Sequence, residues 1–133
     1  MTGIDGCLAE AMTIPGARGA SLVEWTTGLT LGTAGDGPTA GHGEHGDDEA
    51  AAAEAAEVAR LVFESGAFRS GPAAAGPVEE LIVTARGSYH LIRFVETAFD
   101  SSVFLHLWLD RTEANLAVAL FRIKDLTARL VAA

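Results

Sequence analysis

The chain lacks the features of disulfide-stapled, membrane-spanning or exported proteins. Cys7 is the only cysteine among 133 residues, so no disulfide can form within one chain. No apolar run approaches the roughly 20 residues of a membrane-spanning helix. The first residues carry Asp5 and Glu10 and no basic segment ahead of an apolar one, so we expect no signal peptide. We interpret residues 1–133 as a single cytoplasmic domain.

Basic residues are scarce as well. The chain has 9 lysines and arginines against 18 acidic residues, and its formal net charge is −9. The imbalance is concentrated in residues 36–64, where eight acidic residues accompany Arg60 alone. Such a surface repels a polyanion, so we do not expect nucleic-acid binding. In a folded domain this stretch reads most simply as a solvated acidic helix face.

Apolar periodicity predicts three helices and five strands. The helices are expected over residues 3–13 and 47–65 and from Thr112 to the C-terminus, and the strands over 19–25, 29–34, 79–86, 89–96 and 103–109. Loops of about 35–46 and 66–77 flank the second helix. Because the strands are joined by short hairpins, we expect a largely antiparallel sheet in an α+β fold.

The clearest hairpin joins the third and fourth predicted strands. We predict a two-residue type II′ turn at Gly87–Ser88, because glycine at the first central position favours that turn. This register places Leu81 opposite Phe94. It also sets Glu80 diagonal to Arg93, within reach of an ion pair.

The last predicted strand, VFLHLWL, is apolar on both faces apart from His106. That pattern is typical of a central strand covered by helices on both sides. We therefore expect this strand to anchor the core through Phe104, Leu105, Leu107 and Trp108. His106 is interpreted as a core histidine whose hydrogen bonds are satisfied, and His90, near the hairpin tip, as a solvent-facing residue.

Residues 41–46 contain the spacing G-x-G-x-x-G, but their context argues against nucleotide binding. The dinucleotide motif requires a strand directly before the glycines and a parallel strand after the helix. Here the stretch DGPTA stands between the preceding strand and Gly41, and the strand after the helix turns back in a hairpin. Asp47, Asp48 and Glu49 also crowd the helix start, where a pyrophosphate would have to lie.

The same loop offers metal ligands without a defined site. His42 and His45 are candidates for adventitious zinc or nickel binding, with Glu44, Asp47 and Asp48 nearby. No second ligand cluster has telling spacing, so we predict neither a functional metal nor a cofactor. Cys7 lies beside an apolar helix stripe and reads as an inert thiol, and no catalytic motif is present.

The segment IPGARGASLVEWTTGLTLG, residues 14–32, resembles the first hairpin of roadblock (dynein light chain roadblock) domains, particularly bacterial and actinobacterial members. A Pro-Gly pair ends the first helix, a strand rich in small residues follows, and a polar turn ending in glycine leads to the second strand. The order helix, two strands, helix, three strands, helix matches as well. The resemblance covers nearly the whole chain.

The resemblance implies a five-stranded antiparallel sheet with the second helix on one face and the first and third helices on the other. It also implies a homodimer built through the second helix and the third strand, and a non-enzymatic role as regulator or scaffold of small Ras-like GTPases. On this chain the implied dimer interface maps to two short stretches, comprising Ala51, Ala55, Val58 and Val62 of the helix and Leu81, Val83 and Ala85 of the strand.

Two other functions stay open from the sequence. A small-molecule sensor would hold its ligand in a cavity beside Trp108. A metal-dependent enzyme would use the loop 42–49, and zinc titration would separate it from an interaction module.

Overall fold

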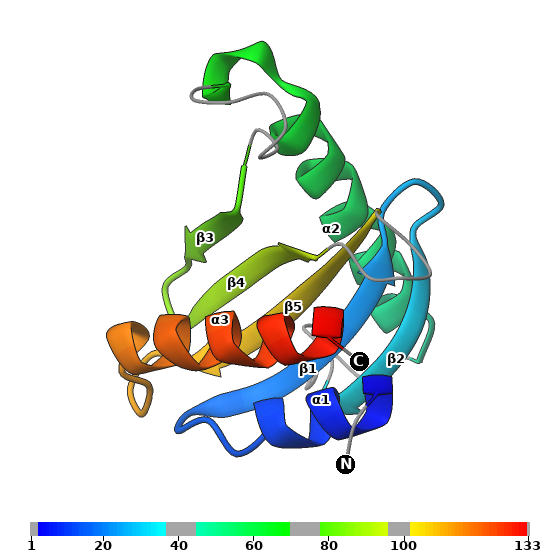
Figure 1. The fold of residues 1–133 in the computed structure, drawn as a ribbon. Coiled ribbons are helices and arrows are strands. Elements are labelled where there is room, and N and C mark those ends of the chain that lie inside the picture. The colour runs from blue at the N-terminus through cyan, green and yellow to red at the C-terminus, as the bar shows by residue number, and fades with distance from the viewer. Residues whose placement is uncertain (1–2, 37–44, 70–77, 96–101, 133) are drawn as a thin grey trace.

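The computed structural model describes residues 3–36, 45–69, 78–95 and 102–132, and within 45–49 and 131–132 only the backbone. These residues form three helices around one five-stranded antiparallel sheet (Figure 1). The sheet order is β2-β1-β5-β4-β3. This confirms the predicted fold class and places the last strand at the centre of the sheet.

The elements follow the predicted order with small shifts at their ends. They are α1 (Gly3–Ala11), β1 (Ala17–Glu24), β2 (Leu29–Gly35), α2 (His45–Glu64), a short 3-10 helix η1 (Gly66–Phe68), β3 (Glu80–Thr84), β4 (Ser88–Val95), β5 (Val103–Asp110) and α3 (Leu116–Ala132). In the described part of the chain, no helix is long and apolar enough to cross a membrane.

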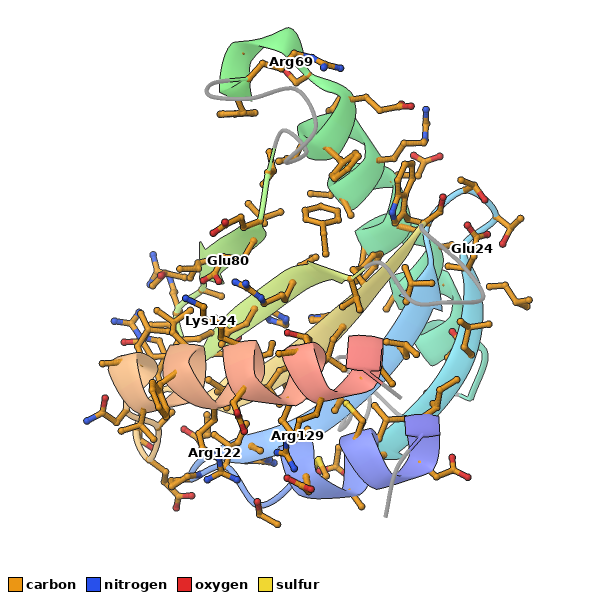
Figure 2. The ribbon with its side chains drawn as sticks, in the orientation of Figure 1. Glu24, Arg69, Glu80, Arg122, Lys124 and Arg129 are labelled. Carbon is orange, nitrogen blue, oxygen red and sulfur yellow. The ribbon has the colours of Figure 1, made fainter. Side chains whose placement is uncertain are left out.

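Helices α1 and α3 cover one face of the sheet, where the larger core lies (Figure 1). Odd-numbered residues of β5 point into this core, and Leu105, Leu107 and Leu109 are fully buried there. Leu8 from α1 and Ile123 from α3 pack against them. The two helices are also joined on the outside, where Arg129 forms a bidentate ion pair with Glu10 (Figure 2). The alternation of strand side chains therefore divides β5 between two cores.

Helix α2 covers the opposite face with a smaller core. Its buried residues are Ala52, Ala56 and Ala59, which pack with Val23, Ile92 and Phe104. Trp25, Phe63 and Phe94 extend this core, with ring centroids 5.3 Å apart in the first pair and 4.9 Å in the second. Alanines bring the helix close to the sheet, and the aromatic rings fill the space where the helix leaves it.

The β1–β2 hairpin forms as predicted. Gly28 has φ of 79°, which only glycine adopts without strain, and its N–H bonds to the carbonyl of Glu24. The Glu24 carboxylate, labelled in Figure 2, accepts hydrogen bonds from the backbone and hydroxyl groups of Thr26 and Thr27. Burial opposes its ionisation, but these hydrogen bonds hold its pKa below the usual value.

The predicted register of the β3–β4 hairpin is wrong by two residues. Leu81 lies opposite Ile92, and the turn is closed at Arg86–Gly87 by a hydrogen bond from Ala85 N–H to the Ser88 carbonyl. Ser88 cannot serve as a turn residue because it pairs with Asp110 in the next ladder. A shift of two residues leaves every side chain on its predicted face.

Two further features can be compared with the sequence analysis: the ion pair across the β3–β4 hairpin and the start of the last helix. Glu80 and Arg93 form the expected ion pair, and they lie directly opposite each other rather than on a diagonal. The last helix begins later than predicted: Thr112 lies in the turn before it, where its hydroxyl donates to Asp110. Asn115 caps α3 instead, accepting from the N–H of Val118.

Candidate functional site

Strand β3 is an edge of the sheet with apolar side chains exposed along it. It pairs with β4 on one side and with no strand on the other in the described residues. Ile82 is 39% exposed and Val83 42%, while Leu81 and Ala85 are half-buried. The strand contains neither proline nor lysine, the residues that usually protect such an edge. It can therefore accept another strand through its free backbone groups.

The predicted interface residues of α2 lie beside its sheet-facing side. Ala52, Ala56 and Ala59 meet the sheet, whereas the four residues Ala51, Ala55, Val58 and Val62, named here the α2 stripe, lie one position away on the helix surface. Val58 is 47% exposed and the other three stripe residues are half-buried. Because five of these seven residues are alanine, hydrophobicity alone could not say which side faces the sheet.

The structure brings the two predicted parts of the interface onto the same side of the sheet. Leu81 packs against the small core under α2, and Val83 points to the same face because strand residues alternate. Ala55 of the stripe touches that core as well. The stripe and the exposed edge therefore lie on the same side of the sheet.

Sequence reasoning missed the most exposed large apolar side chain among the described residues of α2. Leu61 is 71% exposed and points away from the sheet, and Phe68 of η1 is 55% exposed. Glu54 and Glu57 are exposed on the same helix, and Arg60 pairs with Glu64 across one turn. The available signal was a leucine placed one turn from Glu57 and from Glu64, on the acidic side of the helix.

Four polar and aromatic side chains form a connected group near the β3–β4 turn. Ser88 Oγ lies 3.1 Å from His90 Nε2, and His90 Nδ1 lies 2.9 Å from His106 Nε2. The His90 ring stacks parallel to Trp108, with centroids 6.0 Å apart. His106 is buried as predicted, but His90 is half-buried and hydrogen-bonded rather than simply solvent-facing. Trp108 is only half-buried, so it is less of a core anchor than predicted.

Burial sets the protonation of this group. It lowers the pKa of His106 to about 4, with a smaller contribution from the charge of His90, and it also lowers the pKa of His90. Both rings are therefore neutral near neutral pH, and one donates to the other. The linking atoms of Ser88, His90 and His106 are thus paired with one another.

The loop that carries the candidate metal ligands lies mostly outside the described residues. His42 falls outside them, and His45 begins α2 without a described side chain. Among the described residues, no group of three histidine, cysteine or acidic side chains is placed to hold a metal ion. Cys7 is half-buried, and its pKa is raised by burial and by the nearby charge of Glu10, which makes the thiol a weak nucleophile.

Solved structures that resemble this chain include a Roadblock/LC7 domain and MglB proteins. A Roadblock/LC7 domain from Streptomyces avermitilis matches with a TM-score of 0.69 at 17% identity, over 96% of this chain and 93% of that chain. Myxococcus xanthus MglB matches with a TM-score of 0.68 at 16% identity, over 96% and 87%. An MglB with a tetrameric arrangement gives 0.71 at 17%, over 96% and 85%.

Sequence comparison alone finds no counterpart, since no protein-family model and no curated protein matches the chain. The structural likeness spans 96% of this chain and 93% of the Streptomyces avermitilis domain, and the element order agrees with that of a roadblock domain. The resemblance read from residues 14–32 is therefore confirmed at the level of the fold. The chain has the fold of roadblock domains.

Proposed function

We propose that this chain is a single-domain, non-enzymatic, cytoplasmic interaction module that forms a homodimer and regulates or scaffolds a small Ras-like GTPase. The unprotected apolar edge of β3, lying on the same side as the α2 stripe, is the observation that carries the proposal. Pairing of two β3 edges about a twofold axis satisfies their free backbone groups and continues the sheet.

The α2 stripe suits close contact with its own copy. Ala51 and Ala55 allow two helices to approach closely, and Val58 adds exposed apolar area. An isologous contact of this kind buries the same residues twice. The MglB with a tetrameric arrangement is a structural neighbour that assembles from several copies, which agrees with self-association.

The homodimer is tested with one variant in the α2 stripe and one matched control. Ala55→Glu places a charge in the stripe, whereas Ala50→Glu places the same charge at an exposed position of the same helix. Light scattering should give twice the 13.8 kDa chain mass for the wild type and for Ala50→Glu, and a shift towards the monomer for Ala55→Glu. A monomeric wild type at micromolar concentration would refute the homodimer.

The GTPase partner is assigned to the outer side of α2. Leu61 stays outside both the sheet contact and the stripe, and glutamates surround it. An apolar anchor with an acidic rim favours a partner that offers an apolar pocket with basic residues around it.

The tagged protein should capture a small GTPase from its own host, identified by mass spectrometry, with binding that differs between GDP and a non-hydrolysable GTP analogue. Leu61→Arg should abolish capture. Phe121→Arg, at a 75% exposed position of α3 on the other face, is the matched control and should leave it unchanged. Equal loss with both variants, or no nucleotide dependence, would contradict this role.

A further inference from the structure

Ser88, His90 and His106 form a chain of hydrogen bonds that neither the dimer edge nor the outer side of α2 uses. Ser88 Oγ lies 3.1 Å from His90 Nε2, and His90 Nδ1 lies 2.9 Å from His106 Nε2. A hydroxyl is therefore followed by an imidazole engaged at both nitrogens, with a third group behind it. Proteins activate a serine in this way, with a base beside the hydroxyl and another residue that orients the base.

Strands β4 and β5 hold the three side chains in this order. Ser88 and His90 are two residues apart on β4, so they project from the same face of the sheet. His106 lies on β5, two residues from Trp108, which is the ladder partner of His90. The His90 ring also stacks parallel to the Trp108 ring, with centroids 6.0 Å apart. The base is thus fixed by a stacked ring and by hydrogen bonds at both of its nitrogens.

The two ends of the chain differ in their access to solvent. Ser88 is half-buried and follows the exposed turn residues Arg86 and Gly87, whereas His106 is 7% exposed. Burial lowers the pKa of both histidines, so both rings are neutral near pH 7. When the Nδ1–H of His90 donates to His106, the Nε2 of His90 has a lone pair that can accept the hydroxyl proton of Ser88.

The surroundings of His90 favour an uncharged reaction partner. Val83 and Trp108 are its two ladder partners, and they flank it on the same face of the sheet. Val83 is 42% exposed and Trp108 is half-buried, so an apolar group can pack on both. The net charge of −9 repels an anionic partner. An acyl group with an uncharged leaving group suits this surface best.

We propose that Ser88 is a nucleophile that accepts an acyl group from an uncharged activated ester or thioester, with His90 as its general base. Ser88 Oγ forms a bond to the acyl carbon while its proton passes to His90 Nε2. The bond from that carbon to the leaving oxygen or sulfur then breaks, and the proton on His90 goes to the leaving group. The products are an acylated Ser88 and a free alcohol or thiol.

His106 is a positioning residue in this step, because it accepts the Nδ1–H of His90 and holds the ring. One transfer uses up the serine, so the chain is an acyl acceptor rather than a catalyst with turnover. The site lies at the start of β4, and the reaction requires neither the homodimer nor the GTPase proposed above.

The uncharged activated ester p-nitrophenyl acetate tests the proposal on the wild-type chain. Peptide mapping by mass spectrometry after a brief exposure compares acetylation of Ser88 with that of Ser65. Ser65 is also half-buried, but its Oγ accepts a hydrogen bond from the N–H of Ala67. A general base raises such a rate by about 10²–10⁴-fold, so Ser88 should react at least about 100-fold faster than Ser65. A smaller ratio would overturn the proposal.

His90→Gln distinguishes a base from a side chain that only forms hydrogen bonds. Glutamine can still bond to Ser88, but it cannot take up its proton near neutral pH. Acetylation of Ser88 should therefore fall at least about 100-fold in this variant, while acetylation of Ser65 stays the same. A variant whose Ser88 reacts as fast as in the wild type would show that His90 is not the base.

A pair of substitutions tests the positioning role of His106. His106→Gln keeps an acceptor for the Nδ1–H of His90 and should retain most of the reactivity of Ser88. His106→Leu removes the acceptor and should lower that reactivity at least about tenfold relative to His106→Gln. Equal rates in the two variants would show that His106 does not orient the base.

The pH profile gives a readout that does not depend on a variant. The rate at Ser88 should be nearly constant between about pH 7 and 8 and should fall in acid with a midpoint below 6.5, because His90 must be neutral and burial lowers its pKa. The charged group nearest to Ser88 in the ladder is Asp110, which is paired with Arg18. An unassisted serine reacts as its alkoxide, so its rate rises about tenfold per pH unit. A rate at Ser88 that rises in the same way would refute the proposed base.

Discussion

Acid should destabilise this protein through His106 before its carboxylates are affected. The side chain is 7% exposed, and burial lowers its pKa from 6.5 to about 4. The unfolded chain therefore binds one more proton than the folded chain between these two pH values, and stability falls as pH falls through that window. Above about pH 6.5 the stabilisation is fully present, and below about pH 4 no further change comes from this residue.

The magnitude follows from the size of the shift. Each pKa unit corresponds to about 1.4 kcal/mol. The free energy of unfolding should therefore fall by about 3 kcal/mol over the whole window, and by about 2 kcal/mol between pH 7 and pH 5. The carboxylates whose pKa is held low, Glu10, Glu24 and Asp110, lose their contribution below their ordinary values of 4.5 and 3.8 and so lie outside that range. His90 adds a change of the same sign, because its pKa is lowered too.

Urea unfolding at about pH 7, 6 and 5, at one fixed protein concentration, measures the effect. His106→Gln removes the titrating ring and keeps a group that can hydrogen-bond to His90. At pH 7 the variant is expected to have a lower free energy of unfolding than the wild type. At pH 5 the difference between the two free energies should be smaller by about 2 kcal/mol. If the difference in free energy of unfolding stays constant over this range, His106 does not lose its proton on folding. Burial would then not lower its pKa as described.

Three further substitutions test the fold itself by chemical and thermal unfolding. Phe104→Ala should cost about 3–5 kcal/mol because its ring is fully buried, while Trp108→Ala, at a half-buried site, should cost clearly less in the monomer; equal losses would contradict the packing described for β5. Glu24→Ala removes the acceptor of four hydrogen bonds and should cost about 1–3 kcal/mol, so an unchanged melting temperature would show that the β1–β2 turn does not need it. Gly19→Ala would place a Cβ 1.7 Å from the carbonyl oxygen of Asp36 and should cost about 3 kcal/mol or more, and a variant as stable as the wild type would show that the backbone there can move freely.

The sequence by itself determined the order of the elements and the centre of the sheet. The run VFLHLWL is apolar in both alternating sets, which suits only a strand covered on both faces, and β5 is that strand. Gly28 marked the first hairpin because a tight turn there needs a positive φ. These are local signals, carried by residues adjacent in the chain, and they lead to the same fold as the structure.

Other features were decided only by tertiary contacts. The register of the β3–β4 hairpin depends on β5, since the pairing of Ser88 with Asp110 moves the turn to Arg86–Gly87. The orientation of α2 depends on the sheet, because a helix of alanines and glutamates has no single apolar side of its own. The pairing of β4 with β5 brings together Ser88, His90, His106 and Trp108. The two strands are distant in the sequence, so no local pattern predicts this contact. Spacing within one strand tells which face a side chain takes, but the ladder between strands tells which side chains meet.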